Sequence, residues 1–143
     1  MIGVQPYIAY SGNCQEAIDF YKDALGAELL YAQSYGESPM AEMGPAHYIM
    51  HATMKVGDTH IMMCDQPGSE GAASGSNISL AIGLDDTGKA RTIFEALADG
   101  GNVTMPLDKT FWAEAFGMLT DKFGVNWMVN CDAPKETDQT AAA

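Results

Sequence analysis

The pattern of apolar and polar residues along the chain predicts eight strands and two helices. The strands are expected at 4–10, 27–35, 48–56, 59–65, 77–84, 102–107, 115–121 and 125–131, and the helices at 13–26 and 85–101. The order is strand, helix, strand, strand, strand, and it then occurs a second time. Such a unit leaves one sheet face uncovered, so two units are expected to pack together around one core.

In the first predicted helix, apolar side chains recur at helical spacing. This apolar face comprises Cys14, Ala17, Ile18, Tyr21, Ala24 and Leu25. Asn13 and Glu16 have capping-box spacing, and Gly26 stands where a left-handed residue would end the helix. The second helix presents Ala90, Ile93, Phe94 and Leu97 on one face.

A two-residue turn at Gly57-Asp58 is expected to join the third and fourth strands as a hairpin. Counting outward from this turn places His51 opposite Cys64 and Lys55 opposite His60. Period-two alternation then assigns a polar face to these residues and an inward face to Met50, Ala52, Met54, Ile61 and Met63.

Two ten-residue segments support an internal repeat. KVGDTHIMMC (55–64) and KFGVNWMVNC (122–131) share Lys, Gly and Cys at the first, third and tenth positions. The repeated order of elements makes duplication the better explanation. A Gly/Ser-rich stretch at 66–76 is predicted to link the two units, and residues 132–143 form a polar tail.

Composition restricts the classes of partner. The chain has 143 residues, 47% of them apolar, and 19 acidic against 7 basic side chains give a net charge of -12. This charge argues against nucleic acid and anionic membranes. No signal peptide or long apolar run is evident, and three cysteines without a CxxC motif favour a reduced, cytoplasmic setting.

Four segments carry a resemblance to a known family: AIDFYKDALGAE (17–28), NISLAIGLDD (77–86), ALADGGNVTMPL (96–107) and FWAEAFGMLTDKFGVNWMVNC (111–131). They resemble the PhnB-like, or demethylubiquinone methyltransferase-like, branch of the vicinal oxygen chelate superfamily. That superfamily includes glyoxalase I, bleomycin and fosfomycin resistance proteins and extradiol dioxygenases. The resemblance implies an α+β glyoxalase-like domain over 1–131, with two βαβββ modules (about 4–66 and 77–131) curving a mixed sheet around a cavity. It also implies a homodimer.

Metal-using members of the superfamily take four ligands, one from each of four strands lining the cavity. The resemblance places these positions on Pro6, on Ile61 or Met63, on Ser79 and on Met128. Divalent cations in such sites prefer imidazole and carboxylate ligands, which none of these residues provides. We therefore expect no superfamily metal and no other cofactor. The alternative is a divalent metal on relocated ligands, drawn from His47, His51, His60 and the acidic residues.

The same positions and their neighbours predict a cavity for a small, partly apolar molecule. Its candidate ligand-binding residues are Ile8, Tyr10, Met63, Ser79, Trp112, Asn126 and Met128. Binding without a metal is the first hypothesis, a metal-dependent lyase or dioxygenase the second, and a dimeric scaffold the third. Catalysis, ligand identity and a lid role for loop 36–47 stay open at this point.

Other candidate residues have a functional and a structural interpretation. His51 with Cys64 is either an activated thiolate pair or a partly exposed structural pair, and the structural interpretation is favoured. Asp121 and Glu114 are acid–base candidates, although Asp121 in Thr-Asp-Lys-Phe-Gly is better explained as a turn residue. The Gly-rich stretch precedes a strand rather than a helix, which argues against a Rossmann-type methyl-donor site.

Overall fold

The computed structural model describes residues 3–68 and 77–132, which form two compact units. The units comprise residues 1–73 and 74–143, so the predicted modules 4–66 and 77–131 fall one in each. Most of the predicted linker (69–76) and of the predicted tail (133–143) lies outside the described residues. Within the described ranges, neither helix is long and apolar enough to cross a membrane.

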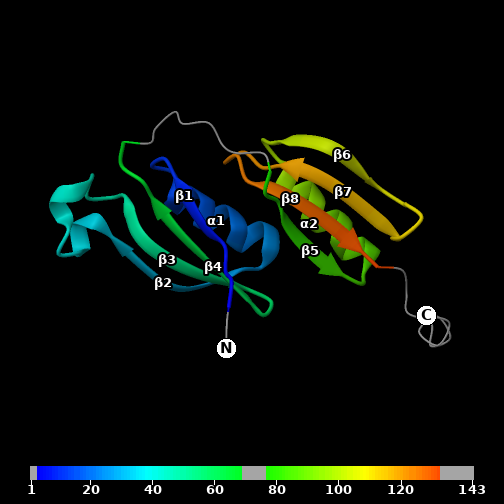
Figure 1. Ribbon diagram of the computed structural model, residues 1–143, viewed down its shortest axis with the longest axis horizontal. Helices are drawn as coiled ribbons and strands as arrows, with labels where there is room; N and C mark the ends of the chain where they lie inside the picture. The colour runs from blue at the N-terminus through cyan, green and yellow to red at the C-terminus, as the bar shows by residue number, and fades with distance from the viewer. Residues whose placement is uncertain (1–2, 69–76, 133–143) are drawn as a thin grey trace. The chain divides into compact units, whose positions relative to one another are not determined.

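The N-terminal unit is a four-stranded mixed sheet with a helix packed on one face (Figure 1). Along the chain its main elements are β1 (Tyr7–Tyr10), α1 (Cys14–Leu25), β2 (Glu28–Ser34), β3 (Ile49–Val56) and β4 (Thr59–Asp65). Two short 3₁₀ helices, η1 (Tyr35–Glu37) and η2 (Ala41–Met43), connect β2 to β3. The strand order is β1-β4-β3-β2, in which β1 and β4 are parallel and the other neighbours antiparallel.

The C-terminal unit repeats this topology. Its elements are β5 (Leu80–Leu84), α2 (Thr87–Ala98), β6 (Asn102–Asp108), β7 (Ala115–Thr120) and β8 (Asn126–Cys131). The strand order is β5-β8-β7-β6, and β5 again pairs in parallel with the last strand of its unit. The prediction of an α+β fold made of two βαβββ modules is confirmed.

Each helix packs its apolar face against the sheet of its own unit, α1 against β2, β3 and β4, and α2 against β6, β7 and β8. The buried residues of α1 are Cys14, Ala17, Ile18, Tyr21 and Ala24, and those of α2 are Ala90, Ile93, Phe94 and Leu97. These are the faces that the helical spacing predicted, except that Leu25 at the end of α1 is only half-buried. Each core therefore lies between one helix and one face of one sheet.

The sequence predicted the C-terminal end of α1 correctly but not the cap at its N-terminal end. Gly26 ends the helix with a φ of 66°, as predicted, because a left-handed residue is favoured there when it lacks a Cβ. The capping box of Asn13 and Glu16 is wrong, since the Asn13 side chain makes no capping hydrogen bond. The carboxylate of Asp65, at the end of β4, instead accepts from the backbone N–H of Cys14 at 2.9 Å.

Asp65 connects three elements of the N-terminal unit. Its Oδ1 accepts from the N–H groups of Gly12 (2.8 Å) and Cys14 (2.9 Å), and its Oδ2 accepts from that of Ile49 (2.9 Å). The side chain is 2% exposed, so these backbone donors replace water around the carboxylate. The loop before α1, the start of β3 and the end of β4 are thereby fixed to one another.

The β3–β4 hairpin has the predicted register. Val56 pairs with Thr59 and Lys55 with His60, and continuing this register places His51 opposite Cys64. The prediction that Met50 faces inward is wrong. The pairing with β2 shifts by one residue between Gln33 and Ser34, and this bulge buries Ile49 and leaves Met50 half-exposed.

Candidate functional site

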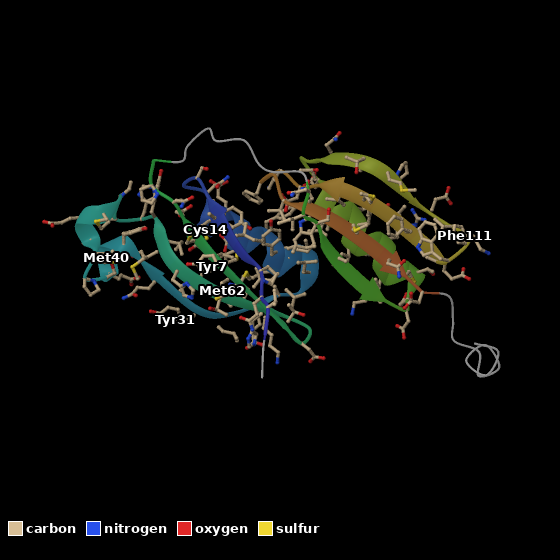
Figure 2. All side chains as sticks on the ribbon, in the orientation of Figure 1. Tyr7, Cys14, Tyr31, Met40, Met62 and Phe111 are labelled. Carbon is tan, nitrogen blue, oxygen red and sulfur yellow. The ribbon has the colours of Figure 1, made fainter. Side chains whose placement is uncertain are left out.

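The two faces of the N-terminal sheet differ in burial and in chemistry. Five apolar side chains that alternate toward α1 are at most 6% exposed, namely Tyr10, Ala52, Met54, Ile61 and Met63. On the other face Tyr7 is 53% and Tyr31 50% exposed. Figure 2 labels Tyr7, Tyr31 and Met62 over this sheet. The face away from α1 is therefore the accessible one.

Three of the predicted ligand-binding residues lie on the α1 side. Ile8 and Tyr10 share the same face of β1, and their partners on β4 are Met63 and Asp65. The Tyr10 hydroxyl donates to the Tyr21 hydroxyl of α1 at 3.3 Å. The structure thus places these side chains toward the helix core, and the site proposed below uses the opposite face.

The other four predicted residues belong to the C-terminal unit. Asn126 and Met128 alternate with the buried Trp127, so they face away from α2. Ser79 precedes β5 and is exposed. Trp112 is 49% exposed between β6 and β7, with its ring centroid 5.3 Å from that of Phe116.

The ten-residue repeat, when aligned by its shared letters, is one residue out of step with the alignment of the two sheets. In β1–β4 the last pair is Tyr10 with Asp65, and in β5–β8 it is Leu84 with Cys131. Cys131 is therefore equivalent to Asp65, not to Cys64 as the repeat of sequence letters indicated. The β7–β8 turn between Thr120 and Asn126 is longer than the turn at Gly57-Asp58.

The positions transferred to the N-terminal unit lie on the helix side of its sheet, whereas those on β8 lie on the accessible side. By the alternation of side chains along β1 and β4, the helix side carries Pro6, Ile61 and Met63. The accessible face next to them carries Tyr7 and Met62. Tyr7 was missed by the sequence interpretation. The sequence of β1 holds no clear signal for it, because the two faces of the strand, Ile8 with Tyr10 and Tyr7 with Ala9, differ little in polarity.

A group of hydrogen-bonded side chains lies on the accessible face of the N-terminal sheet. The Tyr7 hydroxyl is 3.2 Å from His51 Nδ1, and the Thr53 hydroxyl is 3.3 Å from His51 Nε2. The Tyr7 hydroxyl also hydrogen-bonds the Cys64 thiol. The rings of Tyr7 and Tyr31 approach the imidazole of His51, with centroid distances of 5.7 and 6.2 Å. We call these five residues, from four strands, the Tyr7–His51 cluster.

The ionisation of this cluster argues against a reactive thiolate. Burial raises the pKa of Cys64, the hydrogen bond from Tyr7 lowers it, and the carboxylate of Asp65 raises it again, with a net shift upward. Burial is also the largest cause of the raised pKa of Tyr7. At neutral pH both groups are protonated, so the thiol is not the nucleophile that a low-pKa cysteine provides.

The candidate metal ligands do not assemble. His47 is exposed next to the Tyr48 ring, and His60 stands opposite Lys55 on the hairpin. Across residues 3–68 and 77–132, no three or more His, Cys, Asp or Glu side chains are grouped so that they could hold a metal ion. Both ring nitrogens of His51 are already within hydrogen-bonding distance of hydroxyl groups.

Asp121 serves as a turn residue, as the sequence favoured. It is 3% exposed, and its Oδ1 accepts from the N–H groups of Phe123 (2.8 Å) and Val125 (3.0 Å). Its Oδ2 accepts from Trp127 Nε1 at 2.9 Å. Glu114 is half-exposed, and its N–H donates to the carbonyl of Cys131. The buried carboxylates of Asp65 and Asp121 thus hold the backbone.

Comparison with known proteins identifies the family. Residues 3–129 match the sequence pattern of the Glyoxalase/Bleomycin resistance protein/Dioxygenase superfamily. The chain belongs to this superfamily. It is 38% identical over 138 residues to Protein YjdN of Escherichia coli K12, a match covering 89% of this chain and 93% of YjdN.

Two solved structures are similar to this chain over nearly its whole length. Protein PA1353 from Pseudomonas aeruginosa is 39% identical with a TM-score of 0.82, over 93% of this chain and 99% of that one. A PhnB protein from Bacillus cereus, described as a putative 3-demethylubiquinone-9 3-methyltransferase, is 24% identical with a TM-score of 0.80. That match covers 91% of this chain and 99% of the other, and at this identity it supports the fold alone. The predicted membership of the superfamily is confirmed.

Proposed function

We propose that this superfamily member binds a small, partly apolar molecule on the sheet face that carries the Tyr7–His51 cluster. The observation that carries the proposal is a half-exposed group of aromatic and hydrogen-bonding side chains, held in place by four strands. Apolar surroundings with a few fixed polar groups are typical of small-molecule sites. Tyr7 and Tyr31 supply apolar ring surface, and the hydroxyls and imidazole supply directional contacts.

We further propose that binding does not use a metal at the superfamily's strand positions. The accessible residues there are Tyr7, Met62, Ser79 and Met128, which offer a phenol, two thioethers and an alcohol. Oxygen- and nitrogen-coordinated divalent cations prefer carboxylate and imidazole ligands, so this donor set does not fit. Elemental analysis of protein purified without chelator tests this: a stoichiometric metal that remains in His51 and His60 variants would contradict it, and one that these substitutions remove would support the alternative of relocated ligands.

A library of small aromatic and aliphatic molecules, screened by thermal unfolding, tests the proposal. A ligand present at 100 times its Kd stabilises the folded state by about 2.7 kcal/mol through mass action. Tyr31→Ala should abolish the rise in Tm, because it removes one of the two half-exposed tyrosine rings of the cluster. Phe111→Ala is the matched control, since Phe111 is 96% exposed and lies in the other unit. A screen without any stabilising compound would reject the proposal.

Two further proposals rest on family membership and cysteine usage. We propose a homodimer, for which light scattering should give twice the chain mass of 15.3 kDa. We also propose a cytoplasmic location, in keeping with three free cysteines, Cys14, Cys64 and Cys131.

A further inference from the structure

The accessible face of the N-terminal sheet is nearly free of carboxylates in a strongly acidic chain. The strands β1 to β4 carry two acidic residues, Glu28 and Asp65. Asp65 is buried on the α1 side, where backbone N–H groups occupy both oxygens. Glu28 begins β2 at the sheet margin, opposite Lys55. Since the chain has 19 acidic residues against 7 basic ones, this face is chemically distinct from the rest.

The same face is rich in hydrogen-bond donors. His51 lies between the hydroxyls of Tyr7 and Thr53, and Lys55 and His60 pair further along the hairpin. In a neutral imidazole one ring nitrogen donates and the other accepts, so when Nδ1 of His51 carries the proton, the Tyr7 hydroxyl accepts from it and can turn its own proton outward, while the Thr53 hydroxyl donates to Nε2. In that arrangement an incoming acceptor meets the O–H donor of Tyr7 beside the imidazole.

The aromatic side chains next to these donors provide a surface for a planar ligand. The Tyr7 ring meets the His51 ring edge-on, with an interplanar angle of 62°, and the Tyr31 ring is tilted by 45° to it. The Tyr31 hydroxyl donates to Gln33 Oε1 at 3.0 Å, which fixes the ring position. Exposed tyrosine rings favour contact with other aromatic groups.

We propose that the ligand is an aromatic carboxylic acid in its anionic form. This inference rests on the proposed function and specifies its ligand class. The aromatic ring lies against Tyr7 and Tyr31, and the carboxylate accepts from the Tyr7 hydroxyl, whose proton the hydrogen bond from His51 turns outward. Hydrogen bonds to an ionised acceptor are about twice as strong as neutral ones, so the carboxylate gains more there than a neutral oxygen would.

The net charge of -12 does not strongly oppose the binding of an anionic ligand at the cluster. At physiological ionic strength exposed charges are screened beyond about 8 Å, and the buried carboxylate of Asp65, which does act on Cys64, already accepts three backbone N–H groups. The competing ligand class is an organic cation held over the tyrosine rings by cation–π attraction. Such sites gain from a nearby carboxylate, and the acidic residue that the strands carry on this face, Glu28, stands opposite Lys55.

Three probes with the same ring and different charge distinguish these classes: 2-naphthoate, 2-naphthamide and 2-naphthylmethylammonium. Their affinities are measured by NMR titration of ¹⁵N-labelled full-length protein at pH 7.5. We expect 2-naphthoate to bind about tenfold more tightly than the amide, with shifts centred on the amides of Tyr7, Tyr31 and His51. The ammonium compound should bind more weakly than either.

Two variants test the assigned donors. Tyr7→Phe keeps the ring and removes the hydroxyl, and His51→Gln removes the imidazole, so both should reduce the preference for naphthoate over naphthamide. His47→Gln should leave it unchanged, because His47 lies exposed outside the cluster. Circular dichroism confirms that each variant is folded before titration.

The possible outcomes separate the two proposals. Equal binding of naphthoate and naphthamide at the cluster would overturn the anionic ligand and leave small-molecule binding intact. Tightest binding of the ammonium compound would overturn it in favour of a cation site. Naphthoate binding that keeps its preference in Tyr7→Phe and His51→Gln would overturn the assigned donors. If none of the probes or the screened library bound this face, the proposed function would fail as well.

Discussion

Replacing the buried Asp65 by Asn should destabilise the N-terminal unit although the two side chains have the same shape. The carboxylate accepts three backbone N–H groups, two on Oδ1 and one on Oδ2. An Asn side chain has one acceptor oxygen and one NH₂ group. If the oxygen keeps the N–H groups of Gly12 and Cys14, the NH₂ group faces the N–H of Ile49, and two donors meet without an acceptor.

The magnitude follows from these contacts. A hydrogen bond to a charged group contributes about 1.5–3 kcal/mol, and a buried donor left unpaired costs about 1–3 kcal/mol. The loss of charge offsets part of this, because a neutral side chain is less costly to bury than a carboxylate. We expect Asp65→Asn to lower the free energy of unfolding of the N-terminal unit by about 2–4 kcal/mol.

Native-state hydrogen exchange measures this effect at the residues concerned. The amides of Cys14 and Ile49 should lose protection by a factor of about thirty to several hundred, which corresponds to the expected free energy. Asp58→Asn is the control, because Asp58 is exposed in the hairpin turn and its substitution should change stability by less than about 0.5 kcal/mol. If Asp65→Asn and Asp58→Asn gave the same protection, the carboxylate would not hold the three elements together.

Two further predictions concern other parts of the molecule. Gly117→Ala should destabilise the C-terminal unit by about 1–3 kcal/mol in chemical denaturation, because a Cβ there would come within 2.7 Å of Phe94 Cε1. Gly83→Ala, with nothing within 4 Å of the added Cβ, should not, and equal effects would refute the packing argument. At pH 8–9 iodoacetamide should alkylate Cys64 more slowly in the folded protein than in urea, because burial raises the pKa of the thiol and leaves less thiolate. The rate in the folded protein should increase as the pH rises, because more of the thiol is then ionised. Tyr7→Phe should slow the reaction further, since the Tyr7 hydrogen bond lowers that pKa, and peptide mapping showing faster alkylation would contradict this.

Local patterns were sufficient to predict the elements and their order. Helical spacing identified the buried face of α1 from Cys14 to Ala24, and the Gly57-Asp58 turn gave the register of the hairpin. Both signals depend on neighbours within a few residues. They could be found because backbone geometry alone fixes the periods of a helix and a strand.

The functional face could not be assigned from such patterns. Alternation separates Ile8 and Tyr10 from Tyr7 and Ala9, but it does not say which set a helix covers. The shared letters of the repeat then matched Cys64 with Cys131, although the first lies on the accessible face and the second in the α2 core. Turn lengths differ between the two hairpins, and a single added or missing residue exchanges the faces.

The role of Asp65 was hidden for a different reason. Its three donors belong to Gly12, Cys14 and Ile49, which are far from it in the sequence. The two-residue alternation of β4 does place Asp65 on the same face as Ile61 and Met63. An acidic residue on the buried face of a strand was therefore a signal that could have been used. The partners of that carboxylate require the tertiary structure.

The parallel pairing of the first and last strands of each unit has a consequence for synthesis on the ribosome. β1 is made first, but its partner β4 ends at Asp65, so the sheet cannot be completed before nearly the whole unit has left the exit tunnel. Until then the start of α1 lacks the carboxylate that accepts its N–H groups. The C-terminal unit has the same delay, because β5 waits for β8, which ends at Cys131. Folding during translation should therefore proceed in two late steps, each at the end of a unit, rather than by gradual growth from the N-terminus.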